Sequence, residues 1–171
     1  MNERLADIKL LILDVDGVMT DGRIVYDANG IETKFFNVKD GHGIKMVQRA
    51  GIHVAIISGR KSPVVDVRAR ELGIDIVYQG ALDKLSPFEE VLASTGLDAS
   101  QVAFMGDDII DLPIIRRVGF AAAPCDAVDE VLEAVHFTSR NRGGWGAVRE
   151  LCDLLLKGLG RWDEITARYA R

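Results

Sequence analysis

Short apolar runs alternate with segments of helical periodicity along most of the chain. Five runs have the length and composition of buried strands: residues 8–13, 53–57, 74–78, 101–105 and 118–122. Helices are predicted over residues 41–50, 63–72, 84–95, about 109–117, 128–134, about 146–156 and 162–169. This alternation predicts an α/β fold, with a doubly wound, mostly parallel sheet and helices on both of its faces.

One segment, at about residues 23–36, interrupts the alternation. Its two strand-like runs flank Ala28-Asn29-Gly30, and Asn-Gly between such runs is a strong signal for a β-hairpin. The hairpin follows the first strand, so it is expected to project over the edge of the sheet where that strand ends. It carries the apolar side chains of Ile24, Tyr26, Phe35 and Phe36. Either it folds onto its own domain or, as we favour, it packs against other subunits.

The composition is that of a globular protein. The chain of 171 residues is 48% hydrophobic and 27% charged, so we expect residues 1–171 to form a single domain. A net charge of −5 without a basic stripe argues against nucleic-acid binding. Without a membrane-length apolar run or a signal peptide, we expect a cytoplasmic protein with no membrane contact. Cys125 and Cys152 fit neither a metal spacing nor a disulfide framework.

Polar residues gather where the predicted strands end. Asp14 and Asp16 follow the first strand, Ser58 the second, Lys84 the third and Asp107 the fourth. Because parallel strands align their carboxyl ends, these five side chains are expected to meet at one edge of the sheet. Each alone has an ordinary explanation as a turn residue, a helix cap or a solvated lysine. Together they favour phosphoryl transfer to an aspartate with Mg²⁺.

The chemistry of each group suggests its role. Asp14 is the predicted nucleophile, which forms an aspartyl-phosphate. Asp14, Asp107 and the backbone carbonyl of Asp16 offer the oxygen ligands that Mg²⁺ prefers. Lys84 and Ser58 are expected to bind the transferring phosphate oxygens. Asp16 is the predicted acid/base, which protonates the leaving alcohol and later deprotonates the attacking water.

Four neighbouring residues are predicted to support this chemistry. Asp108 and Asp111 follow the same strand as Asp107 and are expected to orient Lys84 or metal-bound water. Gly59 and Arg60 follow Ser58 and are predicted to contact substrate, because a guanidinium pairs well with a carboxylate. The alternative for Arg60 is an ordinary surface arginine.

Four segments resemble, in order, the motifs of the haloacid dehalogenase superfamily of phosphatases. They are DVDGVMT at 14–20, ISGR at 57–60, the isolated Lys84 and GDDIID at 106–111. The spacing leaves no room for a large cap domain. The hairpin, residues 58–62, Gln79-Gly80 and the tail 142–150 further resemble the capless 3-deoxy-D-manno-octulosonate 8-phosphate phosphatases.

This resemblance implies a Rossmann-like core and Mg²⁺-dependent hydrolysis of that sugar phosphate, in lipopolysaccharide precursor synthesis. It also implies a homotetramer whose neighbouring subunits cover each site. In that family, relatives acting on nine-carbon keto-sugar phosphates tend to carry Glu where Arg60 stands, so Arg60 favours the eight-carbon substrate. Activity on nine-carbon or other sugar phosphates is the alternative. The segment Arg142-Gly143-Gly144 either closes over a neighbour's pocket or is an ordinary loop.

A response-regulator receiver, which is a signalling module, is a more remote alternative. It also combines an acidic pair, a phosphorylated Asp, a hydroxyl residue, a Lys and Mg²⁺. However, a receiver carries its acidic pair on the first strand, whereas here the pair Asp107-Asp108 comes last. The motif order therefore favours the phosphatase.

Overall fold

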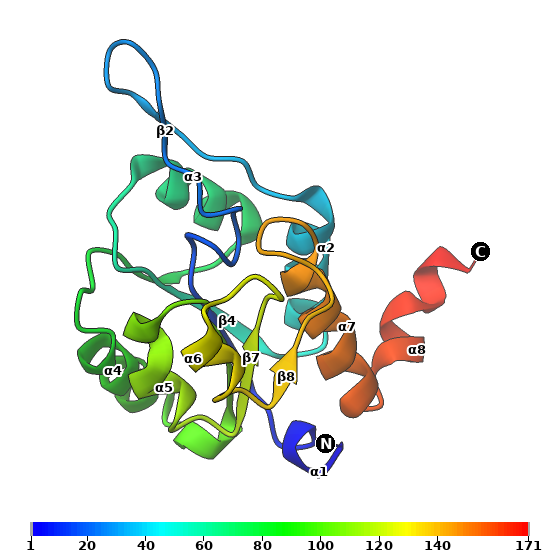
Figure 1. The fold of residues 1–171 in the computed structure, drawn as a ribbon. Coiled ribbons are helices and arrows are strands. Elements are labelled where there is room, and N and C mark those ends of the chain that lie inside the picture. Colours follow the sequence, from blue (N-terminus) through cyan, green and yellow to red (C-terminus); the bar gives the residue numbers. More distant parts are fainter. Residues whose placement is uncertain (1, 171) are drawn as a thin grey trace.

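Six parallel strands form the central sheet of the computed structural model, which describes residues 2–170 (Figure 1). In spatial order they are β5 (Ile76–Tyr78), β4 (His53–Ile57), β1 (Leu10–Leu13), β6 (Val102–Met105), β7 (Phe120–Ala123) and β8 (Phe137–Thr138). At the centre, Leu13 of β1 pairs with Ile56 on one side and Met105 on the other. The predicted doubly wound α/β fold is confirmed.

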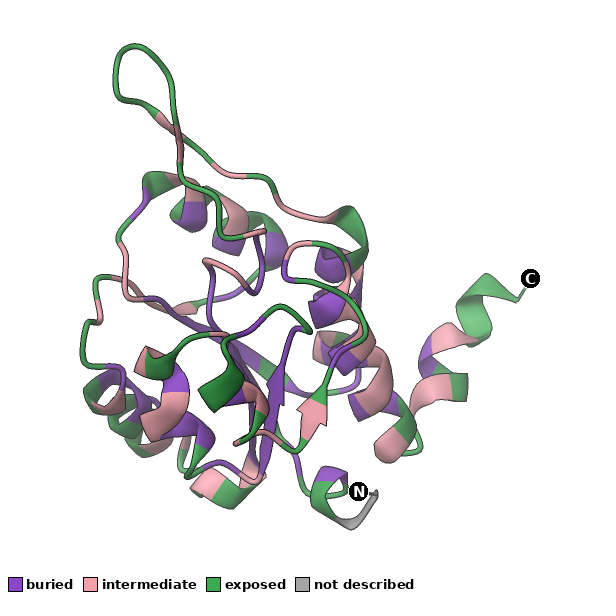
Figure 2. Ribbon diagram, in the orientation of Figure 1, coloured by how far each residue is buried: buried purple, intermediate pink, exposed green. Residues whose placement is uncertain are grey.

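The sheet is apolar because helices cover both of its faces. One face carries α2 (Val38–Arg49), α3 (Pro63–Leu72) and α7 (Ala147–Gly158). The other carries α4 (Leu85–Thr95), α5 (Leu112–Ile115) and α6 (Asp129–Leu132). Successive residues of a strand point to opposite faces, so Leu11 and Leu13 pack toward α2 and α7, whereas Ile12 packs toward α4 and α5. Figure 2 shows this buried centre.

The predicted hairpin is present between β1 and α2. Its strands, β2 (Val25–Tyr26) and β3 (Glu32–Thr33), are antiparallel and extend away from the sheet (Figure 1). In the turn, the Asp27 carboxylate accepts hydrogen bonds from the backbone N–H groups of Asn29 and Ile31. Gly30 has a φ of 76°, a left-handed conformation that glycine adopts without strain. The turn chemistry therefore fixes the hairpin.

The apolar side chains of the hairpin divide into two groups. Ile24, Tyr26 and Phe35 are exposed. Phe36 instead packs against the core and lies 5.6 Å from the Arg68 guanidinium carbon, measured to the ring centre. Packing onto its own domain thus accounts for Phe36 but leaves the other three side chains uncovered in the single chain.

Several boundaries differ from the prediction. The helix expected over 109–117 is instead a 3₁₀ turn, Ile109–Asp111, followed by the short α5. Pro113 lies in the first turn of α5 and has no backbone N–H to donate to the turn before it, so the two segments stay separate. Helix α2 begins at Val38 rather than at residue 41, because the Asn37 side chain caps it. The tail divides into α8 (Trp162–Thr166) and a 3₁₀ turn, Ala167–Tyr169. Most other predicted ends are displaced by one or two residues, the usual uncertainty of element boundaries.

Two short elements had no sequence signal. These are α1 (Asn2–Leu5) and β8, both too short to establish a periodicity. Across residues 2–170, none of the helices combines the length and the hydropathy that crossing a membrane requires.

Candidate active site

The sequence-predicted residues converge on one cavity at the carboxyl ends of β1, β4 and β6. Its volume is about 240 Å³. The predicted residues that line it are Asp14, Asp16, Ser58, Gly59, Arg60, Lys84, Asp107 and Asp108. Asp111 lies beneath this cavity, fully buried. The loops after parallel strands therefore meet as expected.

The side chain of Lys84 connects three of these loops. Its Nζ lies 2.9 Å from Asp14 Oδ1 and 2.6 Å from Asp111 Oδ1. The Lys84 side chain is only 1% exposed. Burial by itself lowers the pKa of a lysine, but the two carboxylates outweigh burial and raise the pKa of Lys84 above its usual value. Lys84 therefore stays a charged ammonium beside Asp14.

Asp111 anchors both Lys84 and the loop after β6. While Oδ1 accepts from Lys84, Oδ2 accepts the backbone N–H groups of Asp107 at 3.0 Å and Asp108 at 3.3 Å. This geometry agrees with the predicted orienting role of Asp111. The Asp108 carboxylate, in contrast, accepts from the backbone N–H of Ile109 and so caps the following turn.

Acidic side chains at the floor of the cavity form a candidate cation site. Asp14, Asp107 and Asp111 can each place one carboxylate oxygen within 4.8 Å of the others. Burial raises the pKa of Asp107 to about 8, and the nearby charges of Asp14 and Asp111 add to this effect. Burial also raises the pKa of Asp14, to about 6, although Lys84 opposes the shift. Carboxylates that repel one another and offer only oxygen fit a hard cation such as Mg²⁺.

Gly17 brings the backbone of the first motif against Asp107. A Cβ atom on Gly17 would lie 2.0 Å from Asp107 Oδ2, and the φ of Gly17 is 87°. Only glycine allows both this approach and this conformation. The backbone immediately after Asp16 therefore passes beside the Asp107 carboxylate. This supports the prediction that the Asp16 carbonyl joins Asp14 and Asp107 in binding the cation.

The loop after β4 presents Ser58, Gly59 and Arg60. Backbone hydrogen bonds fix Ser58, whose N–H donates to Tyr78 O at 2.9 Å and whose carbonyl accepts from the N–H of Ala81 at 3.0 Å. The Arg60 side chain is 37% exposed at the cavity, and its Nε lies 3.8 Å from Asp16 Oδ2. The structure therefore places Arg60 at the site, in contact with its charged groups.

The hairpin contributes site residues that the sequence analysis missed. Glu32 Oε1 accepts a 2.8 Å hydrogen bond from Arg60, and the Lys34 ammonium forms an ion pair with Asp16. The Tyr26 hydroxyl accepts a hydrogen bond from Arg60 at 3.2 Å. A weak signal was available, because Glu32 and Lys34 are two positions apart and so share one face of an extended strand.

The segment Arg142-Gly143-Gly144 packs on its own chain. The N–H of Gly144 donates to Val18 O at 2.9 Å, and a Cβ atom on Gly143 would lie 1.8 Å from Gly17 O. The two glycines thus permit close backbone contact beneath the first motif. This contact explains the two glycines within the single chain, whereas Arg142 is exposed.

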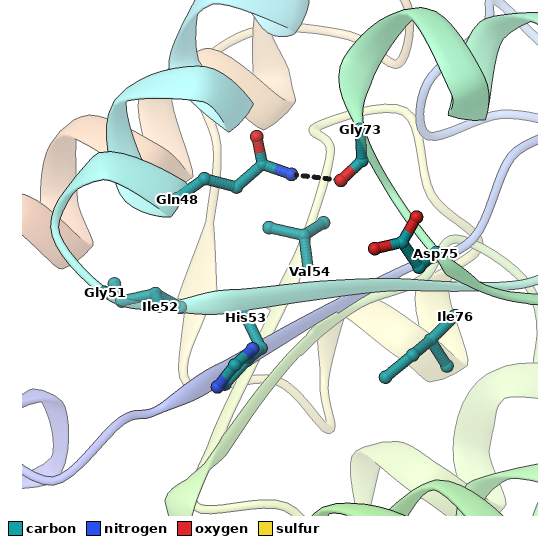
Figure 3. A pocket seen from close by; sticks show the side chains of 8 residues that line it. All are labelled: Gln48, Gly51, Ile52, His53, Val54, Gly73, Asp75 and Ile76. Atoms are coloured by element: carbon teal, nitrogen blue, oxygen red, sulfur yellow. Dashed lines mark hydrogen bonds between the residues drawn. The ribbon is translucent and has the colours of Figure 1, made fainter.

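A second cavity of about 410 Å³ lies at the opposite edge of the sheet, near the amino ends of β4 and β5 (Figure 3). Gln48 donates a hydrogen bond to Gly73 O across its wall, and His53 and Asp75 are its ionisable residues. No cluster of carboxylates or cations described in the structure lines this cavity. The predicted chemistry belongs to the first cavity.

Comparisons with known proteins agree with this geometry. Residues 37–119 match the model of the haloacid dehalogenase-like hydrolases. The chain is 48% identical over 154 residues to 3-deoxy-D-manno-octulosonate 8-phosphate phosphatase KdsC of Yersinia pestis, covering 90% of this chain and 82% of that protein. It is 46% identical over 158 residues to KdsC of Escherichia coli K12, covering 92% and 84%.

Solved structures give the same result. A probable yrbi family phosphatase of Pseudomonas syringae superposes with a TM-score of 0.98 at 45% identity, covering 99% of this chain and 97% of that one. The 3-deoxy-D-manno-octulosonate 8-phosphate phosphatase of Moraxella catarrhalis, in complex with a magnesium ion, a phosphate ion and KDO, gives a TM-score of 0.96 at 39% identity. That match covers 98% of this chain and 97% of the Moraxella chain.

The raised pKa values predict how Mg²⁺ affinity varies with pH. Because the pKa of Asp107 is about 8, a proton on its carboxylate competes with the cation at lower pH. The Mg²⁺ affinity should therefore rise from pH 6 to 8 by about tenfold per pH unit, and somewhat more steeply near pH 6, where Asp14 is also partly protonated. It should then level off. Isothermal titration calorimetry on metal-free protein measures this, with the exposed Asp163→Asn as control. Asp107→Asn should bind Mg²⁺ weakly and lose most of the pH dependence. Constant affinity of the unaltered protein across this range would contradict the site.

Proposed function

The chain belongs to the haloacid dehalogenase-like hydrolases, in the family of 3-deoxy-D-manno-octulosonate 8-phosphate phosphatases. On that premise we propose that it hydrolyses 3-deoxy-D-manno-octulosonate 8-phosphate to the free sugar acid and phosphate. One observation carries the proposal. Asp14, Asp16, Ser58, Lys84 and Asp107 line a single cavity in a chain 46–48% identical to proteins of that name. The enzyme is thus a phosphoric monoester hydrolase.

Asp14 is the nucleophile in the proposed reaction. Lys84 engages one oxygen of its carboxylate and so orients the side chain at the cavity. With a pKa of about 6, Asp14 is mostly ionised at neutral pH. As the bond from Asp14 to phosphorus forms, the bond from phosphorus to the sugar oxygen breaks and its electron pair moves to that oxygen. The product is an aspartyl-phosphate and the sugar alcohol.

Asp16 transfers the protons of both steps. In the first step its carboxylic acid gives a proton to the leaving sugar oxygen. In the second step its carboxylate takes a proton from the water that attacks phosphorus, and Asp14 is released unchanged. The position of Asp16 at the cavity wall, two residues after the nucleophile, supports this assignment.

Ser58 and Lys84 bind the oxygens of the phosphate. Lys84 has three N–H donors, and Asp14 and Asp111 accept two of them, so one remains for a phosphate oxygen. The Ser58 hydroxyl provides a second donor on the opposite loop. Donors that are fixed before the reaction stabilise charge in the transition state, an effect of several kcal/mol.

Mg²⁺ is the cofactor of this chemistry. The carboxylates of Asp14 and Asp107 and the carbonyl of Asp16 would hold it, with Asp111 orienting the loop behind them. When bound, the cation offsets the negative charge of nucleophile and phosphate and so permits their approach.

Arg60 is the proposed determinant of the sugar. Glu32 and Tyr26 hold its guanidinium at the cavity, where a substrate carboxylate can pair with it. Gly59 also lines the cavity, and an added Cβ there would contact Ile110 at 3.5 Å. Nine-carbon keto-sugar phosphates remain the alternative substrates.

We also propose that the enzyme is a single-domain cytoplasmic protein that acts as a homotetramer in lipopolysaccharide precursor synthesis. The exposed Ile24, Tyr26 and Phe35 of the hairpin support assembly, because apolar side chains of this size are usually covered. The cysteines, Cys125 and Cys152, are both free, which fits a reducing compartment.

Phosphate release tests the substrate. With Mg²⁺ present, we expect kcat/KM for 3-deoxy-D-manno-octulosonate 8-phosphate to exceed that for a nine-carbon keto-sugar phosphate and for common sugar phosphates by at least about tenfold. A preference for one of the other substrates would keep the phosphatase chemistry and overturn this assignment.

Substitutions test the roles of the two aspartates. Asp14→Asn should reduce turnover at least about a thousandfold, because the nucleophilic carboxylate is lost. The thermal unfolding midpoint should stay within a few degrees, because the amide oxygen of Asn can still accept from Lys84 and Asp111 still balances the charge of that ammonium. Asp16→Ala should slow both the formation and the hydrolysis of the phosphoenzyme in stopped-flow measurements, with Asp163→Asn as control. Turnover retained by Asp14→Asn, or both rates unchanged in Asp16→Ala, would contradict the assignments.

A further inference from the structure

We propose that Lys34 is a positioning residue for this reaction, which binds Oδ1 of Asp16 and so orients Oδ2 to carry the proton that the leaving oxygen receives. The proposal rests on the proposed function, because it takes Asp16 as the acid/base. It adds a role for the hairpin in the chemistry of the site.

The burial of Lys34 is unusual for its place in the fold. Its side chain is 1% exposed, although the backbone of this segment faces solvent and the neighbouring residues Ile31 and Phe35 are exposed. Lysines normally keep their ammonium in water, and burying one is costly unless it is paired. The partners of this ammonium are Asp16 and, at 3.3 Å, Glu32. Its burial is therefore explained by these ion pairs.

Two cations from different segments lie beside the two oxygens of Asp16, and the one from Lys34 is hydrogen-bonded to it. Lys34 contacts Oδ1 from the hairpin, and Arg60 approaches Oδ2 at 3.8 Å from the loop after β4. Glu32 lies between the cations, 3.3 Å from Lys34 Nζ and 2.8 Å from an Arg60 nitrogen. The four side chains thus form a closed ring of alternating charge, which restrains each member.

The two cations are placed differently with respect to the cavity. Arg60 lines it and can reach substrate, whereas the described cavity lining does not include Lys34. Lys34 therefore acts from behind Asp16. This separates a cation that faces substrate from one that orients the acid/base.

The orientation of Asp16 matters because its carboxylate turns about two side-chain bonds. General acid catalysis requires the donor within hydrogen-bond distance of the leaving oxygen, and a carboxylate free to rotate spends less time there. Loss of Lys34 should therefore slow hydrolysis most for substrates whose leaving oxygen is most basic, because these depend most on protonation by Asp16.

A series of aryl phosphates from phenyl to p-nitrophenyl phosphate measures how strongly the rate depends on protonation of the leaving oxygen. These probes have similar size, lack the sugar and its carboxylate, and differ in the basicity of the leaving oxygen. Because kcat/KM reports the steps through the first phosphoryl transfer, its dependence on leaving-group basicity reports proton donation. A purely structural role of Lys34 would lower all members of the series equally.

The variants are Lys34→Met and, as control, Lys39→Met, which removes an exposed lysine of α2. With Mg²⁺ saturating, Lys34→Met should lower kcat/KM about tenfold or more for phenyl phosphate and less than about threefold for p-nitrophenyl phosphate. Lys34→Arg should recover part of the difference, and Lys39→Met should match the unaltered protein. Lys34→Gln replaces the Met variant if thermal unfolding shows that the latter does not fold.

Asp16→Asn in the same series separates two kinds of failure. If Asp16→Asn steepens the dependence on leaving-group basicity and Lys34→Met does not, the role of Lys34 is overturned while the proposed mechanism stands. If Asp16→Asn leaves the dependence unchanged, Asp16 is not the acid and the proposed mechanism itself fails. Steepening in both variants supports the role of Lys34.

Discussion

The buried ammonium of Lys84, held between Asp14 and Asp111, is the interaction on which the site depends. These two carboxylates are buried at the edge of the parallel sheet, where they repel each other. Without a cation between them, burial would destabilise their ionised forms. Lys84 provides that cation and joins the loops that follow β1, β5 and β6. Asp111 also accepts hydrogen bonds from the backbone N–H groups of Asp107 and Asp108 and so fixes the backbone of that loop. The proposed nucleophile Asp14, the proposed phosphate ligand Lys84 and the loop that carries Asp107 are thereby fixed relative to one another before substrate binds.

A second charge network lies outside this centre and orders the acid/base. Asp16 is only partly buried and is held by Lys34 and Arg60 rather than by core residues. The core therefore supplies the nucleophile and the phosphate site, whereas the hairpin supplies the residues around Asp16 and Arg60. On our proposal, the hairpin between β1 and α2 orients both the acid/base Asp16 and the sugar-binding Arg60.

The sequence was sufficient to predict the sheet and most of the candidate site. Strands buried on both faces, such as Leu10–Leu13, read as continuous apolar runs, and the carboxyl ends of parallel strands must share an edge. Prediction failed where tertiary contacts determine the local structure or the partner of a side chain. The expected helix at 109–117 is divided ahead of Pro113, and β8 has only two residues. Lys34 and Glu32 were missed because their partners Asp16 and Arg60 lie 18 and 28 residues away, a distance over which local periodicity carries no information.

Rapid quenching of a single turnover tests the nucleophilic role of Asp14 most directly. The enzyme is mixed with Mg²⁺ and 3-deoxy-D-manno-octulosonate 8-phosphate, quenched in acid within milliseconds and analysed by peptide mass spectrometry. The predicted result is a phosphate group on the peptide that contains Asp14, which forms as the sugar is released and decays as inorganic phosphate appears. Its absence from Asp14→Asn confirms the position. Phosphate on another residue, or inorganic phosphate released at the same rate as the sugar with no phosphoenzyme at any time, would contradict covalent catalysis by Asp14.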